Sequence, residues 1–132
     1  MAFLSACSGA PAVIDPPLPP QLVSHDELPF GDAVAGQVTR ASNAARDRLE
    51  PQWGRLQSRV YTLAPADAAT MQSAFAQTIP AGWENVPQPD FPAQWGEIRS
   101  YRAGKRFFAL MLVRVRSGDG DIPVVRLSNA AP

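Results

Sequence analysis

Only a few side chains in this chain of 132 residues are of the types that carry out nucleophilic or metal chemistry. The sequence contains one cysteine, Cys7, and one histidine, His25. A nucleophile needs a base held at hydrogen-bond distance, and a metal site needs several ligands that converge. His25 is followed by Asp26 and Glu27 in a proline-rich segment that would not hold its imidazole in place. We therefore expect a solvated histidine, no catalytic thiol, no metal site and no cofactor.

Carboxylates offer a second kind of chemistry, because two of them held at a suitable separation can act as acid and base in hydrolysis. Glu84 and Asp90 fall in a predicted loop and Glu97 falls on a predicted strand, so no local spacing pairs them. Asp119-Gly120-Asp121 resembles a fragment of a calcium-binding loop, but Ile122-Pro123-Val124 stands where an EF-hand would continue towards its last ligand. We expect a hairpin turn there, and a protein that is not an enzyme.

Aromatic side chains around a proline-rich loop form the best candidate for a binding surface. The segment 84–94 holds three prolines, and a loop stiffened in this way can present rings in fixed positions. Rings of this kind bind carbohydrates and small ligands, and they also fill cores. The candidate surface consists of Trp83, Phe91, Trp95 and Tyr101.

The charge and hydropathy of the chain argue against nucleic-acid binding and against a membrane-spanning helix. Twelve basic residues and twelve acidic residues cancel, whereas a nucleic-acid-binding domain carries a positive excess that neutralises phosphates. The longest apolar run, Phe107 to Val113, has the length of a strand and is far short of a membrane-spanning helix. We expect a globular domain that does not bind nucleic acid.

Proline divides the chain into a tether and a domain. Residues 8–29 carry six of the fourteen prolines, which fix φ and lack an N–H, so this segment should be extended. Twenty-odd residues of that kind could reach on the order of 60 Å. We expect residues 1–7 and 8–29 to stand outside a single domain that covers 30–132.

Two helices are predicted within the domain. One begins at Asp32 as its N-cap and ends at Pro51. The second begins near Pro65 and Asp67, ends at Pro80, and turns Met71, Phe75 and Ile79 towards the core. Apolar residues of the first helix recur at helical spacing along one stripe: Val34, Val38, Ala41, Ala45 and Leu49.

The remaining periodic segments are predicted strands. Gln57–Leu63 is β-prone, and three further strands, Trp95 to Arg102, Lys105 to Arg116 and Ile122 to Leu127, form a meander. Gly104 and Asp119-Gly120 supply the turns between them. The fold class is therefore α+β, with a mainly antiparallel four-stranded sheet, two helices and the order α-β-α-β-β-β.

The third predicted strand is apolar on both faces, which is typical of a central strand covered on both sides. Phe107, Ala109 and Met111 lie on one face, and Phe108 and Leu110 lie on the other. If both helices cover the same face, the other face needs a lid, a second copy or a partner.

Leu4-Ser5-Ala6-Cys7 resembles the lipobox of bacterial lipoproteins, in which the cysteine is lipidated and becomes the first residue of the mature chain. The resemblance covers these four residues and the proline-rich segment behind them. A lipoprotein signal also has a basic region and an apolar region of roughly 7–15 residues, which we expect upstream of Met1. Three acyl chains would anchor the protein permanently. Ser8 after the cysteine, by resemblance to enterobacterial sorting, implies the outer membrane.

The sequence thus favours a cell-envelope lipoprotein that faces the periplasm and is anchored through Cys7. Its domain would act as a protein-interaction module for another envelope protein. Two alternatives stay open: an immunity or inhibitor protein that occupies the active site of a toxin or hydrolase, and a small-ligand or glycan binder that uses the Trp83–Trp95 loop.

Overall fold

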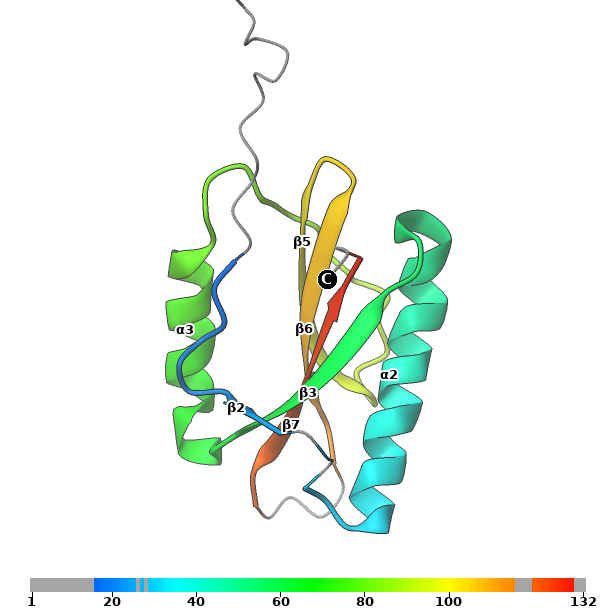
Figure 1. Ribbon diagram of the computed structural model, residues 1–132, viewed down its shortest axis with the longest axis vertical. Coiled ribbons are helices and arrows are strands. Elements are labelled where there is room, and N and C mark those ends of the chain that lie inside the picture. Colours follow the sequence, from blue (N-terminus) through cyan, green and yellow to red (C-terminus); the bar gives the residue numbers. More distant parts are fainter. Residues whose placement is uncertain (1–15, 26, 28, 116–119, 130–132) are drawn as a thin grey trace, which may run out of the picture.

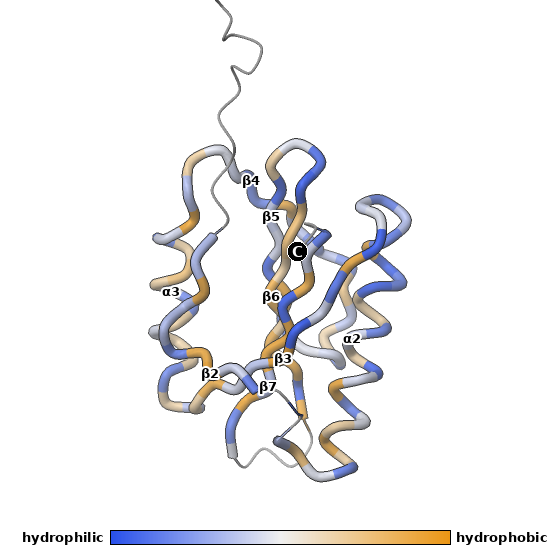
Figure 2. Tube along the Cα trace, in the orientation of Figure 1, coloured by the Kyte–Doolittle hydropathy of each residue, from blue (hydrophilic) through white to orange (hydrophobic). Residues whose placement is uncertain are grey.

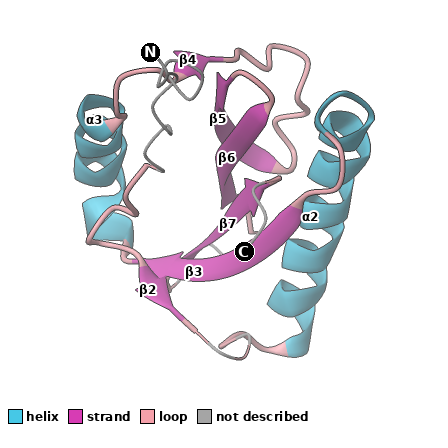
Figure 3. Cartoon of the chain, turned by 45° about the horizontal axis from the view of Figure 1, so that its top comes forward, coloured by secondary structure: helices cyan, strands magenta, loops and turns pink. Residues whose placement is uncertain are grey.

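The computed structural model describes residues 16–25, 27, 29–115 and 120–129. It has three layers, with one helix on each side of a central antiparallel sheet (Figures 1 and 3). The long helix α2 spans Asp32–Trp53, and the shorter helix α3 spans Ala68–Thr78 after a 3₁₀ turn at Pro65–Asp67. The α+β class is therefore confirmed.

Among the described residues the sheet has six strands, so the predicted count of four is wrong. The four long strands are the predicted ones, and each pairs antiparallel with its neighbours. The two additional strands contain two residues each and lie at the two edges, where pairing with a long neighbour defines them. The order across the sheet is β2 (Val23–Ser24), β3 (Gln57–Leu63), β7 (Ile122–Ser128), β6 (Arg106–Val113), β5 (Gly96–Ala103) and β4 (Glu84–Asn85).

Helix α2 differs from its prediction at both ends. Gly31 is the N-cap, and Asp32 is the first helical residue. Pro51 lies within the last turn, where it removes the N–H that would bond to the carbonyl of Asp47, and the helix nevertheless continues to Trp53. Gly54 ends the helix with φ of 82°, and its N–H donates to the carbonyl of Glu50 at 2.8 Å.

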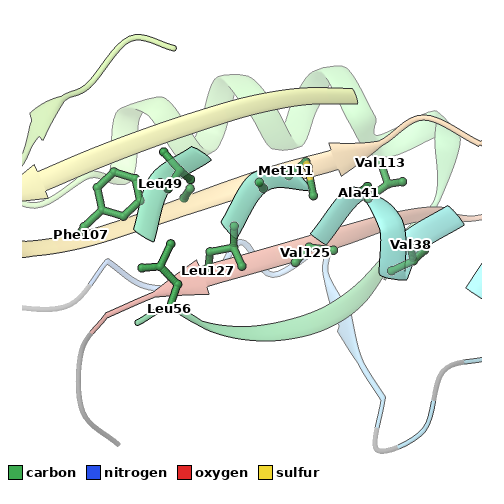
Figure 4. Packing of buried hydrophobic residues seen from close by; sticks show 11 residues of the cluster. Val38, Ala41, Leu49, Leu56, Phe107, Met111, Val113, Val125 and Leu127 are labelled. Atoms are coloured by element: carbon green, nitrogen blue, oxygen red, sulfur yellow. The ribbon is translucent and has the colours of Figure 1, made fainter. Parts of the chain in front are cut away.

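The predicted apolar stripe of α2 packs on one face of the sheet, and Figure 4 shows this contact. Small residues in the middle of the stripe let the helix approach β6 and β7 closely. The buried residues of this α2-face core are Val38, Ala41, Ala45, Leu49, Leu56, Phe107, Ala109, Met111, Val113, Val125 and Leu127.

Helix α3 covers the opposite face with fewer but larger side chains. Met71 and Phe75 are buried and Ile79 packs beside them, as the spacing of four residues predicted. The Phe75 ring is nearly perpendicular to the rings of Tyr101 and Phe108, with centroid-to-centroid distances of 6.0 Å and 5.9 Å. Since the two helices cover opposite faces, neither face of the central strand β6 needs a lid or a partner.

The predicted tether overlaps the folded domain. Pro16 and Pro19 are buried, and Leu22 packs against the α3-face core. Val23–Ser24 forms β2 against Thr62 and Tyr61 of β3. The described part of 8–29 therefore lies on the domain, which begins well before Phe30, while 8–15 lies outside the described residues. Within the described part, Val23–Ser24 is extended along β3, but a turn closed by the Leu22 N–H to the Pro19 carbonyl at 3.1 Å precedes it, so the prediction of an extended segment holds only in part.

Candidate functional site

The four aromatic residues of the predicted binding surface lie on both sides of the sheet. Trp83 and Tyr101 belong to the α3-face core, whereas Phe91 and Trp95 pack against the α2-face core. Each ring is at least partly buried against its own core. The structure therefore divides these residues between the two faces of the sheet and does not form one surface from them.

Trp83 and Tyr101 are held in place by ring contacts with Phe108. The Trp83 and Phe108 rings meet edge to face, with their centroids 5.2 Å apart. The Tyr101 ring stacks on Phe108, with the centroids 5.3 Å apart and 17° between the planes. The guanidinium of Arg106 lies 5.7 Å from the Trp83 ring centroid. These contacts fix the rings as packing elements on the α3 side of the sheet.

The three candidate carboxylates do not converge. Glu84 forms an ion pair with Arg102 at 3.1 Å, and both side chains are at least half exposed. Glu97 is exposed on β5 opposite Leu112, which turns it to the α3 face, whereas Glu84 lies on the α2 face. Asp90 is exposed in the loop, where its backbone carbonyl accepts a hydrogen bond from the Arg48 guanidinium at 2.8 Å.

No three acidic, histidine or cysteine side chains gather into a metal-binding group within the described part of the chain. Asp121 is exposed, and Asp119 lies outside the described residues, as does Cys7. His25 is half-buried, and its Nε2 is hydrogen-bonded to Oγ1 of Thr62 at 2.8 Å, so the expected solvated histidine is wrong. That bond holds the chain on β3 just after β2 ends.

The outer edge of β3 is open over half its length. On its inner side β3 pairs with β7 from Gln57 to Leu63, but on its outer side β2 covers only Tyr61 and Thr62. Among the described residues, none pairs with the outer edge of Gln57–Val60. Figure 1 shows this half of β3 at the front of the sheet, with β7 on its inner side and no described strand on its outer side. Alternate residues of an edge strand turn their N–H and C=O groups to solvent, where another strand can bind them.

A hollow of about 880 Å³ lies beside this open edge. Arg46 and Glu50 of α2 form one wall, and Ser24 and His25 close one end. The Glu50 carboxylate accepts a hydrogen bond from the backbone N–H of Leu56 at 2.8 Å, which ties the chain between α2 and β3. Figure 2 shows that the first half of β3 is mainly hydrophilic. The complete lining is Ser24, His25, Glu27, Arg46, Glu50, Arg55, Leu56, Gln57, Ser58, Arg59 and Val60.

Two arginines lie side by side, one on the open edge strand β3 and one on its inner neighbour β7. Arg59 of β3 is directly opposite Arg126 of β7, so both side chains project from the α3 face. The Arg126 guanidinium lies 5.8 Å from the Phe108 ring centroid. Neither arginine forms an ion pair with a described carboxylate. Within the part of the chain that the structure describes, Arg59 therefore places on the open edge a positive charge that is not ion-paired.

A second hollow, of about 490 Å³, lies beside α2 and includes one predicted site residue, Trp95. Arg40 and Arg114 are exposed at its rim, and Oε1 of Gln37 is buried without a described hydrogen-bond partner. Gln94 completes its lining. It shares no lining residue with the hollow at β3.

The open edge of β3 was not predicted from the sequence, although one feature of the sequence indicates it. Gln57, Ser58 and Arg59 are exposed, whereas Tyr61, Thr62 and Leu63 are buried. A strand that changes from polar to apolar along its length indicates an end that leaves the packed core. The sequence carries no comparable signal for where β2 stops, and that boundary decides how much of β3 stays open.

Within the described residues, no helix is both long and apolar enough to cross a membrane. Comparison with known proteins finds no family model, no curated protein and no solved structure that matches the chain.

Proposed function

We propose that this chain is a lipid-anchored protein-binding module of the bacterial cell envelope. Cys7 carries the lipid at the outer membrane, the domain faces the periplasm, and another envelope protein is the partner. The observation that carries protein binding is the open outer edge of β3 at Gln57–Val60, next to a hollow of about 880 Å³. Unpaired edges of this kind bind extended segments through backbone hydrogen bonds.

The position of the N-terminal segment sets how far the domain stands from a membrane. Since Pro16 is buried on the domain, residues 8–15 set the greatest distance that Cys7 could stand from it. At the extended limit of the chain, nine Cα–Cα steps span about 30 Å. The domain would therefore stay close to the membrane surface, at about half the distance that a tether of 8–29 would allow.

The distribution of polar groups supports binding over catalysis. The described carboxylates considered as acid and base are exposed and face different sides of the sheet. The aromatic residues of the 84–94 region pack into two separate cores. A glycan or ligand site built on that loop would need these groups to converge, so the binding of a protein segment at β3 is the better-supported function.

Expression of the gene with its upstream DNA tests the anchor. We expect the wild-type chain in the membrane fraction and the Cys7→Ser variant in the soluble periplasmic fraction, because lipidation requires the thiol. A Ser8→Ala variant serves as a matched control and should stay with the membrane. Equal distribution of the wild type and Cys7→Ser would overturn the anchor.

A further inference from the structure

We infer that the open edge of β3 accepts an extended, acidic segment of a protein partner as an added antiparallel strand. The inference rests on the proposed protein-binding function and assigns it a surface and a partner chemistry. The added strand continues the line of β2, which pairs antiparallel with Thr62 and Tyr61 on the same side of β3. Backbone groups of Gln57–Val60 supply the hydrogen bonds.

The register of β3 determines where the acidic side chain lies. Residues directly opposite each other on neighbouring strands project from the same face, so the partner residue opposite Arg59 joins the row that contains Arg126. A carboxylate at that position lies directly beside Arg59, with Arg126 one strand further in, and neither guanidinium group has a described acidic partner. Opposite charges across a strand pair stabilise pairing, and like charges oppose it.

The charges around the open edge of β3 also favour an acidic segment. The hollow beside it is lined by three arginines, Arg46, Arg55 and Arg59, and by two glutamates. One of these, Glu50, already accepts the Leu56 N–H through its carboxylate. Among the described residues the lining therefore carries one more positive than negative charge, and Arg126 adds a further positive charge on the neighbouring strand, so an acidic segment complements this surface.

A second copy of this chain fits the edge less well. Antiparallel pairing of two β3 edges centred on Arg59 would place that residue opposite itself and beside two copies of Arg126. Four guanidinium groups would then line one face of the joined sheets. An arginine in this position is a common way of preventing edge-to-edge association of identical chains.

A short capped peptide of alternating threonine and valine, with a glutamate at its centre, is a direct probe. A peptide with lysine at the centre is its matched control. We expect the glutamate peptide to shift and protect amide signals of Gln57–Val60 in NMR spectra of the full chain. The lysine peptide should bind roughly five- to tenfold more weakly.

Reversing the charge of Arg59 tests whether this residue faces the acidic side chain of the partner. Arg59→Glu should weaken binding of the glutamate peptide by roughly five- to tenfold and strengthen binding of the lysine peptide by a similar factor. Arg40→Glu on α2 should change the affinity for neither peptide. Equal binding of both peptides, no binding, or shifts confined to other residues would overturn the inference. Protection of Gln57–Val60 that rises with protein concentration alone, together with dimers in sedimentation, would overturn it in favour of a second copy.

Site-specific photo-cross-linking in the native envelope separates failure of this inference from failure of the proposed function. Ser58 lies on the open edge, and Ser73 lies on the exposed side of α3. Cross-links from position 73 and none from position 58 would overturn the β3 edge while leaving protein binding in place. No cross-link from any exposed position would overturn both.

Discussion

Arg59 on β3 and Arg126 on β7 are directly opposite each other, with both guanidinium groups on the α3 face of the sheet. Arg59 is exposed and Arg126 is half-buried above the Phe108 ring. A like-charged pair in this position opposes pairing of the two strands. The sheet tolerates it because β7 is held on its other side by β6 and because apolar residues bury the rest of the β3–β7 contact.

Arg59→Gln should therefore stabilise the domain. Removal of one charge relieves the repulsion from Arg126, and we expect the free energy of unfolding to rise by about 0.2–1 kcal/mol. Urea unfolding at low salt measures this, and the gain should shrink in about 1 M salt, where charges are screened within about 3 Å. Arg40→Gln, at an exposed position on α2, is the control and should change little. A loss of stability in Arg59→Gln would contradict this account of the pair.

Phe75→Ala should be among the most destabilising substitutions on α3. The Phe75 side chain is buried and contacts the rings of Tyr101 and Phe108 edge to face, so truncation opens a cavity in the α3-face core. We expect a loss of about 3–5 kcal/mol in the free energy of unfolding. Ser73→Ala, at an exposed position two residues away, should stay within about 0.5 kcal/mol. Similar values for the two variants would show that α3 does not pack as described.

Two glycine-to-alanine substitutions should act in opposite directions. At Gly96 a Cβ atom would lie 1.9 Å from the carbonyl oxygen of Leu112, and φ is 139°, so Gly96→Ala should cost about 4 kcal/mol or more. At Gly36, inside α2, the nearest atom is a flexible Arg40 nitrogen at 3.4 Å. Gly36→Ala should therefore raise stability by about 0.5–1 kcal/mol. Thermal unfolding of both variants checks the difference, and the same sign for both would contradict it.

Asn129→Ala should lower stability although the residue lies near the end of the described chain. Its Oδ1 accepts the backbone N–H of Phe107 at 2.8 Å, and its Nδ2 donates to the carbonyls of Trp53 and Lys105 at 3.0 and 2.8 Å. These bonds join β6 to the end of α2, and their loss should cost about 1–3 kcal/mol in chemical unfolding.

Asn129→Asp tests the direction of these bonds. A carboxylate still accepts from Phe107 but opposes the two carbonyl oxygens, so it should be no more stable than Asn129→Ala. Asn43→Ala, which removes an exposed side-chain bond to Arg46, is the control and should stay within about 0.5 kcal/mol. Wild-type stability in Asn129→Asp would contradict the assigned donors.

The long elements could be predicted because their apolar periodicity is strong. The stripe from Val38 to Leu49 and the pair Met71 and Phe75 each fix both the helix and its buried face. The edge strands could not be predicted, since two residues show no alternation and Val23–Ser24 becomes a strand only by pairing with β3. The three hydrogen bonds of Asn129 also depend on contacts between residues far apart in the sequence.

The sequence predicted one surface for the aromatic residues, whereas the structure divides them between the two faces of the sheet. Trp83 and Trp95 flank one loop, so nearness in sequence indicated one surface. The intervening chain pairs with β5 through β4, and the two rings reach opposite faces of the sheet. Which face a residue meets depends on strand register, and a one-residue change in register exchanges the faces. The face that each ring meets is therefore determined only when the strands pair, and the sequence alone does not show it.

Hydrogen–deuterium exchange tests most directly whether a partner occupies the β3 edge. The segment that contains Gln57–Val60 would be followed by mass spectrometry in native envelope preparations and in the same chain purified in detergent. We predict slower exchange of this segment in the envelope, while the exposed side of α3 around Ser73 exchanges equally in both. Equal exchange of Gln57–Val60 in the two preparations would contradict the account.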